Sequence, residues 1–167
     1  MTMTSREIAE LAKKRIDYNR ETGIFTWAES GRGIRMSATA GCADVHGYWK
    51  IKLGRKAYRA HRLAWLIVYG EWPSSDLDHI NGDRLDNRLE NLREATHSLN
   101  MQNKRSAMKN NKSSGLLGVT WNKQHKKWQS KIMVNKVFHH VGYFNCPDEA
   151  HAAYLQKKRA LHAGCTI

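Results

Sequence analysis

The sequence predicts an α+β fold made of two small domains joined by a linker. Two observations predict it. Hydrophobic spacing alternates between helical and strand periods along the chain, and the stretch SAMKNNKSS at 106–114 is polar and rich in Asn, Lys and Ser. A chain of 167 residues can form one compact domain or two small ones. We place the first domain at 1–105, a basic linker at 106–114 and the second domain at 115–167.

The first domain begins with a helix and continues into short strands. Apolar residues recur at helical spacing over 5–16, after a cap at Thr4 or Ser5 with Glu7. The segment 24–27 has the composition of a strand, and 47–60 reads as a hairpin that turns at Gly54 and Arg55. The apolar run 61–69, followed by a glycine, predicts a short buried helix.

The segment 77–104 (LDHINGDRLDNRLENLREATHSLNMQNK) holds most of the chemically informative residues. Its first four residues predict a strand, Asn81-Gly82-Asp83 is a strong turn signal, and a helix is predicted from Thr96. The expected frame is therefore a strand, a loop and a helix. Asp78 and His79 fall on the strand.

The second domain predicts three strands and one helix. The strands fall at 118–122, 128–135 and 137–144. The helix spans 147–162, opened by Pro147 and closed by a glycine, with its inward residues predicted to be Ala150, Ala153, Tyr154 and Leu161.

Charge and cysteine content restrict the partners and the compartment. The net charge is +13, and residues 101–167 carry 12 Lys and Arg against 2 Asp and Glu, which points to a nucleic acid or an acidic membrane surface. Three distant cysteines exclude a four-cysteine zinc knuckle and indicate a reducing, intracellular setting. No apolar run is long enough to span a bilayer, and the charged N-terminus does not resemble a signal peptide, so no membrane partner is expected.

The residues of 77–104 suit metal-assisted hydrolysis of a phosphodiester. Asp78 supplies a charged oxygen for Mg²⁺, and Asn100 supplies a neutral one. A neutral His79 can accept a proton from the attacking water, with Asn91 as the group that orients its ring. Neighbouring residues of a regular strand point to opposite faces, so we expect a bulge or turn that lets Asp78 and His79 reach one phosphate.

Several alternatives stay open. Asn87 competes with Asn91 for the middle position, and the Asx-rich stretch after Ile80 could be a purely structural loop. Arg62 and Arg93 could clamp phosphate or form structural ion pairs. His61 is interpreted as a core histidine, with a phosphate contact as the second reading.

Residues 78–100 resemble the HNH motif of ββα-metal endonucleases, in the version found in phage and intron-encoded homing enzymes. Asp78-His79, Asn91 and Asn100 match its positions, although Asn100 stands where the His-Asn-His version has a second histidine and His97 is assigned to the surface. The upstream YN…GIFTW at 18–27 and AHRLAW at 60–65 resemble the leader of phage HNH proteins. The resemblance implies one Mg²⁺ or Mn²⁺ held by Asp78 and Asn100, His79 as general base, and products with 5′-phosphate and 3′-hydroxyl ends. It also implies the cytoplasm of a bacterial host if the protein is phage-encoded.

The second domain resembles the Apetala-2/ERF-type DNA-binding domain. Shared features include Gly118-Val119, Trp128, Val141-Gly142-Tyr143-Phe144 and Ala153-Tyr154, whereas the guanine-reading arginines of plant members are missing. We expect double-stranded DNA to meet the face of the sheet opposite the helix. The predicted DNA contacts in the whole chain are Arg62, Arg93, Lys104, Arg105, Thr120, Asn122, Lys123, Lys127, Gln129, Lys131, Met133 and Lys136.

The sequence thus predicts a metal-dependent DNA endonuclease that acts as a monomer or weak dimer. The competing hypothesis is a DNA-binding regulatory protein whose nuclease site is vestigial.

Overall fold

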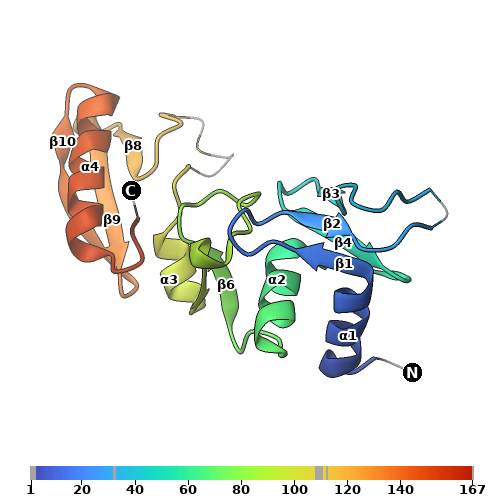
Figure 1. The fold of residues 1–167 in the computed structure, drawn as a ribbon. Coiled ribbons are helices and arrows are strands. Elements are labelled where there is room, and N and C mark those ends of the chain that lie inside the picture. Colours follow the sequence, from blue (N-terminus) through green and yellow to red (C-terminus); the bar gives the residue numbers. More distant parts are fainter. Residues whose placement is uncertain (1–2, 32, 108–110, 112, 167) are drawn as a thin grey trace. The chain divides into compact units, whose positions relative to one another are not determined.

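The computed structural model describes residues 3–31, 33–107, 111 and 113–166, in which helices mix with small antiparallel sheets (Figure 1). The chain divides into two compact units, Met1–Thr96 and His97–Ile167. No helix within the described ranges is long and apolar enough to cross a membrane. The three cysteines, Cys42, Cys146 and Cys165, are free thiols.

The division falls earlier than the boundary we predicted at 105. The last residue of α3 (His97–Gln102) and Lys104 just after it bond to the C-terminal end of the same unit: the Lys158 ammonium donates to the Lys104 carbonyl, and the Gly164 amide donates to Gln102 Oε1 at 3.1 Å. These contacts group α3 with the second unit. Positions 108–110 and 112 of the predicted linker lie outside the described residues.

The first helix, α1 (Ser5–Arg15), begins at a capping box. The Glu7 amide donates to the Thr4 hydroxyl at 3.3 Å, and the Thr4 amide donates to the Glu7 carboxylate at 2.6 Å. Each bond satisfies an amide that a helix start leaves without an internal partner. Thr4 and Glu7 were predicted as the cap, and the structure confirms it.

Two small sheets and a second helix complete the core of the first unit. β1 (Ile16–Tyr18) pairs with β2 (Phe25–Trp27), and β4 (Trp49–Leu53) lies between β3 (Cys42–Ala43) and β5 (Lys56–Arg59). The helix α2 (Ala60–Tyr69) packs against α1 and ends at Gly70, whose φ of 81° is left-handed (Figure 1). The core is formed by fully or nearly buried side chains that include Ile8, Ile16, Phe25, Ile51, Leu63 and Leu66.

A β-hairpin follows α2, and it differs from the expected strand, loop and helix. β6 (Asp76–His79) pairs antiparallel with β7 (Leu92–Ala95), after a single 3-10 turn at Leu89–Asn91. The prediction missed β7 because Leu-Arg-Glu-Ala has little strand propensity by itself. Cross-strand pairing and the burial of Leu92 and Ala95 decide its structure.

The turn between β1 and β2 packs against the loop of this hairpin. Tyr18 donates its hydroxyl to the Asn87 carbonyl at 2.8 Å, and the Leu89 amide donates to the Arg20 carbonyl at 3.1 Å. At Gly23 a Cβ would lie 2.5 Å from the Arg88 nitrogen, so only glycine permits this approach. The upstream segment therefore supports the hairpin loop.

The second unit contains one antiparallel sheet with the order β10-β9-β8. Its strands are β8 (Val119–Asn122), β9 (Lys127–Val134) and β10 (Val137–Phe144). The helix α4 (Pro147–Leu161) packs on the sheet, with Ala150 and Tyr154 buried beside Val119 and Ile132 (Figure 1).

The predicted orientation of Leu161 on α4 is wrong. Leu161 was expected to face inward but is 38% exposed, whereas Lys158 is 1% exposed. The helix ends at Leu161, where the chain turns away, and the Lys158 ammonium is held by the Lys104 carbonyl. A buried ammonium is tolerable when such an acceptor meets it, and hydropathy alone does not reveal the acceptor.

Candidate active site

The end of β6 presents Asp78 and His79 on opposite faces of the hairpin. Asp78 pairs with Arg93 and His79 with Leu92, in a register without a shift, so the bulge we considered is not there. The chain instead turns immediately after the strand, since the Gly82 amide donates to the His79 carbonyl at 2.8 Å. We expected either a bulge or a turn at this point, and the structure contains a turn.

Asp78 is buried and bonded to an arginine. The carboxylate is 6% exposed, and its Oδ2 accepts from Arg93 Nη2 at 2.9 Å and from Nε at 3.2 Å. A buried carboxylate is costly unless it is paired, and Arg93 on the facing strand supplies that pairing. Arg93 thus takes the ion-pair position that we considered for it.

His79 lies in a cluster of rings. Its ring centroid is 5.0 Å from that of His61, in an edge-to-face arrangement, and 6.1 Å from that of Tyr48. Burial lowers the pKa of His79, while Asn87 and the carboxylate of Asp78 oppose the shift. The imidazole is therefore neutral near pH 7, as a general base requires.

His61 is the more deeply buried of the two imidazoles, which confirms its interpretation as a core residue. It is 3% exposed, and burial lowers its pKa to about 3, with the neighbouring His79 and the positive charge of Arg59 acting in the same direction. Its Nδ1 has no hydrogen-bond partner within the described part of the chain.

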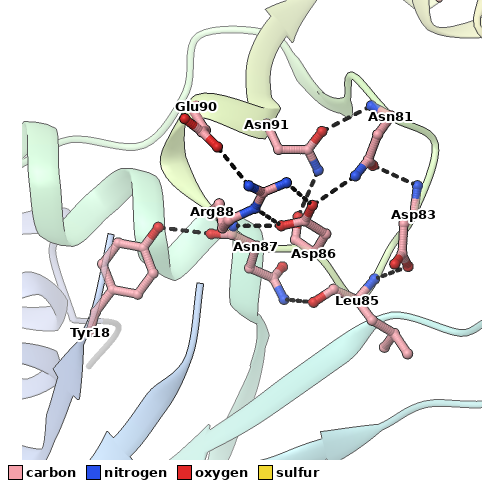
Figure 2. Close-up of polar contacts among 9 residues, drawn as sticks. All are labelled: Tyr18, Asn81, Asp83, Leu85, Asp86, Asn87, Arg88, Glu90 and Asn91. Carbon is pink, nitrogen blue, oxygen red and sulfur yellow. Dashed lines mark hydrogen bonds and ion pairs between the residues drawn. The ribbon is translucent and has the colours of Figure 1, made fainter. Parts of the chain in front are cut away.

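Asn91 organises the loop that joins the two strands (Figure 2). Its Oδ1 accepts from the Asn81 amide at 2.9 Å, and its Nδ2 donates to the Asp86 carbonyl at 2.8 Å. Asp86 in turn holds Arg88 through a 2.8 Å ion pair. The side chain of Asn91 thus fixes the loop, and its backbone carbonyl accepts from Ile80.

The same loop is rich in Asx turns, as the structural-loop alternative anticipated. The Asp83 amide donates to Asn81 Oδ1 at 2.8 Å, and the Leu85 amide donates to Asp83 Oδ1 at 2.9 Å (Figure 2). This loop and the His79 site are not exclusive, because the turns set the path of the chain leaving β6.

Asn87 is the amide side chain that acts on His79. It is 2% exposed, and its Nδ2 donates to the Leu85 carbonyl at 2.9 Å. Among the groups that raise the pKa of His79, against the effect of burial, Asn87 contributes most. Its buried Oδ1 makes no hydrogen bond of ordinary geometry in the described residues. The competition between Asn91 and Asn87 is thus divided by role: the first shapes the loop and the second adjoins the imidazole.

The remaining predicted residues lie in different places. Arg62, on α2, lies over the Trp72 ring with its guanidinium carbon 5.6 Å from the centroid. Asn100 lies on α3 in the second unit, so its part in a site with Asp78 stays a prediction. Arg105 donates to the Thr166 hydroxyl at 2.7 Å, and the Lys104 carbonyl accepts from Lys158.

The predicted DNA-binding face of the second unit is the face opposite α4. Cross-strand partners share a face, and here Gln129 is paired with both Thr120 and Tyr143. Lys131 lies over the Phe138 ring at 5.0 Å. The exposed side chains on this face or at the strand ends are Lys123, Lys127, Met133, Lys136 and His140. Asn122 is half-buried.

Sequence reasoning missed three residues near His79: Tyr48, Arg59 and Arg84. The Tyr48 ring is close to both guanidinium groups and to both imidazoles. Its centroid lies 4.2 Å from the guanidinium carbon of Arg59 and 4.7 Å from that of Arg84. A Tyr in a hairpin and scattered arginines carry no sequence signal. Only their shared proximity to the end of β6 distinguishes them.

The donor set suits a hard divalent ion that keeps part of its water shell. No group of three or more His, Cys, Asp and Glu side chains that could hold a metal occurs in the described ranges. Asp78 provides one buried carboxylate, which fits an ion such as Mg²⁺ that takes one or two carboxylates and completes its shell with water and phosphate. Its Oδ2 is already bonded to Arg93, with which an ion would compete.

Comparison with known proteins is consistent with this geometry. The model of an HNH endonuclease family matches residues 58–102, which run from β5 through α3. Protein 3.8 of Escherichia phage T7 is 32% identical over 110 residues, covering 64% of this chain and 87% of that protein. The chain belongs to the family of Protein 3.8.

The HNH endonuclease domain of this chain indicates a nuclease. DNA is the substrate that such a domain implies. No solved structure matches the chain. The HNH match ends before β8, so the Apetala-2/ERF resemblance of the second unit has no support from these comparisons.

Proposed function

We propose that this protein is a divalent-metal-dependent DNA endonuclease in which His79 is the general base. The observation that carries the proposal is a buried, neutral imidazole at the end of β6, directly after the buried carboxylate of Asp78, inside the matched HNH segment. This juxtaposition gives one group that accepts a proton and one that attracts a cation, as phosphodiester hydrolysis needs.

In the proposed reaction His79 accepts a proton from a water molecule as that water attacks the phosphorus atom. The P–O3′ bond breaks, which leaves a 5′-phosphate on one side and, once the departing oxygen has taken a proton from water, a 3′-hydroxyl on the other. The His61 ring lies edge-to-face with the imidazole, Asn87 interacts with it through a side-chain hydrogen bond, and the loop fixed by Asn91 sets where β6 ends. A Mg²⁺ or Mn²⁺ ion held by Asp78 and Asn100 would stabilise the departing 3′ oxygen.

We further propose that the second unit anchors the enzyme on double-stranded DNA through the sheet face opposite α4. Charge supports this: residues 101–167 contain 12 Lys and Arg but 2 Asp and Glu. The polar and basic side chains of β8 and β9, among them the half-buried Thr120, Gln129 and Lys131, are available to meet the DNA. An Apetala-2/ERF-like module remains the proposed type of this unit.

The phage relative supports action in the cytoplasm of an infected bacterium, which we propose together with a homing-type role. A monomer with one nuclease site would nick one strand, whereas a dimer would cut both.

The test is incubation with supercoiled plasmid in the presence of Mg²⁺, of Mn²⁺ or of EDTA. We expect open-circle product with either ion, none with EDTA, and a loss of at least a hundredfold in rate for His79→Ala with DNA binding retained, since general-base catalysis contributes about 10²- to 10⁴-fold. His139→Ala, which removes an exposed imidazole from β10, is the matched control and should cleave normally.

Full cleavage by His79→Ala would contradict the mechanism. Binding without cleavage under every condition would favour the vestigial-site regulator instead.

A further inference from the structure

Two arginines from separate segments meet on one aromatic ring beside His79. Arg59 ends β5 directly before α2, and Arg84 lies in the loop between β6 and β7. The guanidinium carbons lie 4.2 Å and 4.7 Å from the centroid of the Tyr48 ring. That ring is 5.4 Å from the His61 ring and 6.1 Å from the His79 ring, by centroids.

The two guanidinium groups are both positively charged, and no salt bridge to a carboxylate neutralises either of them within the described residues. Arg15, Arg88 and Arg93, unlike Arg59 and Arg84, do form such salt bridges. The negative face of the Tyr48 ring attracts both cations. An aromatic ring offsets part of the repulsion between two cations but leaves a net positive site.

The acidic group nearest in effect to Arg59 is Asp44, which already has other partners. Arg59 contributes to the lowered pKa of Asp44, but hydrogen bonding to the Tyr48 amide is the leading cause. Asp44 Oδ1 accepts from the His46 amide at 2.8 Å and the Tyr48 amide at 3.0 Å. Its carboxylate therefore orders the loop that carries Tyr48.

Arg84 is oriented from the same loop. Its Nη1 donates to the His46 carbonyl at 2.7 Å, which directs the guanidinium toward Tyr48 and leaves its other donors for a ligand. Both arginines are exposed, so a ligand can reach them. Two guanidinium groups with this freedom form a site for an anion with several acceptor oxygens, and phosphate is the group to which such forks are matched.

We propose that Arg59 and Arg84 clamp one backbone phosphate of the DNA strand that is cut, next to the phosphodiester attacked with the help of His79. Tyr48 is the positioning residue of this clamp. The inference rests on the proposed nuclease function and extends it to substrate placement. DNA is favoured over free phosphate because the site adjoins His79 and both arginines continue into segments that hold the imidazoles: Arg59 into α2, Arg84 into the loop after β6.

The first experiment measures binding of a duplex oligonucleotide as a function of salt, in a His79→Ala background that prevents cleavage. The logarithm of affinity falls with the logarithm of salt by about 0.9 for each phosphate neutralised. Replacing both Arg59 and Arg84 with Gln should reduce that slope by about 0.9, because both hold one phosphate, and should weaken binding roughly tenfold at moderate salt.

The matched control removes two charges from the same hairpin but away from Tyr48. Arg55→Gln with Lys52→Gln changes two exposed cations of the β4–β5 hairpin. It should leave the slope within experimental error of the parent. An equal loss of slope in this control would show a diffuse charge effect and overturn the clamp, and so would a fall of about 1.8 in the Arg59/Arg84 variant, which would mean two separate phosphates.

The second experiment separates positioning from folding through Tyr48, in cleavage assays with His79 intact. No hydrogen bond of the Tyr48 hydroxyl is among the side-chain bonds of the described residues, so Tyr48→Phe keeps the ring and should retain the parent kcat and KM. We expect Tyr48→Ala to raise KM and lower kcat together, and we expect the same of the double arginine variant. Circular dichroism should show that Tyr48→Ala is folded. Normal kinetics for a folded Tyr48→Ala would reject its role.

The two proposals fail in distinguishable ways. Cleavage by His79→Ala at the parent rate would overturn the proposed base while the salt slopes still judge the clamp. If His79→Ala does not cleave DNA, but the Arg59/Arg84 variant keeps the parent salt slope of binding and the parent cleavage kinetics, only the clamp is overturned.

Discussion

Burial decides the protonation of His61 on α2 and of His79 at the end of β6. His61 and His79 are 3% and 4% exposed, and burial is the leading cause of the lowered pKa of each. A neutral His79 can accept a proton without first losing one, and a neutral His61 can contact it without charge repulsion. The neighbouring Asp78 instead forms a salt bridge with Arg93 on the facing strand.

The pKa of His61 makes stability depend on pH. Its pKa is about 3 when folded against about 6.5 when unfolded, so the unfolded chain binds the proton first and stability falls as pH drops from 6.5 towards 3. Between pH 7 and pH 5 this residue should remove about 2 kcal/mol from the free energy of unfolding. Urea unfolding at both pH values measures it.

His61→Gln, which does not titrate in this range, should show a smaller decrease by about that amount. A variant whose stability falls with pH as steeply as the parent would contradict the assigned pKa.

Single residues also show the limit of motif reading. Asp78 and His79 were located from the sequence because an acid and an imidazole side by side are a chemical signal. The division of labour between Asn87 and Asn91 was not predictable, since it depends on which amide the loop turns inward. The same holds for Tyr48, Arg59 and Arg84, which meet only after folding.

Among the elements, those with a marked hydrophobic spacing or a cap were predicted, whereas β7 was missed. The helix near the N-terminus, the hairpin at 47–60 and α2 follow from hydrophobic spacing and caps. β7 has four residues, two of them charged, and owes its structure to pairing with β6. Local propensity is too weak to specify a strand of that length.

The packing of α4 on its sheet depends on the absence of a side chain at Gly118. The residue has a φ of 77°, and a Cβ there would lie 2.1 Å from Tyr154 Cδ2. Gly118→Ala should lower the free energy of unfolding by about 2–4 kcal/mol, from backbone strain and overpacking together. Denaturant unfolding of the purified protein is the measurement.

Gly115→Ala is the matched control in the same loop. Its φ is also left-handed, at 68°, but a Cβ there would meet nothing within 4 Å. It should cost only the backbone strain, about 1–2 kcal/mol. Equal losses in the two variants would show that the contact with Tyr154 does not matter.

At the scale of the whole molecule, charge is distributed unevenly along the chain. The excess of Lys and Arg lies in 101–167, while the HNH match lies in 58–102. A polyanion held by the basic unit would be kept at high local concentration around the nuclease domain.

This division gives a prediction for the second unit. Lys131 lies on the sheet face opposite α4, and Lys157 is exposed on the helix itself. Lys131→Gln should reduce the salt slope of DNA binding by about 0.9, whereas Lys157→Gln, with the same loss of charge, should change it much less. Titrations of labelled duplex at several salt concentrations compare them, and equal slopes for both variants would reject the sheet face as the DNA contact.

The sequence by itself determined the chemistry that we propose for this protein: a basic chain with Asp78, His79, Asn91 and Asn100 spaced as in an HNH motif, because residue type and spacing are written directly in it. Tertiary structure decided which side chains surround His79, where the first unit ends, and that Lys158 is buried while Leu161 is exposed. Those features depend on contacts between residues far apart in the chain, and burial sets pKa values and charge placement only once those contacts form.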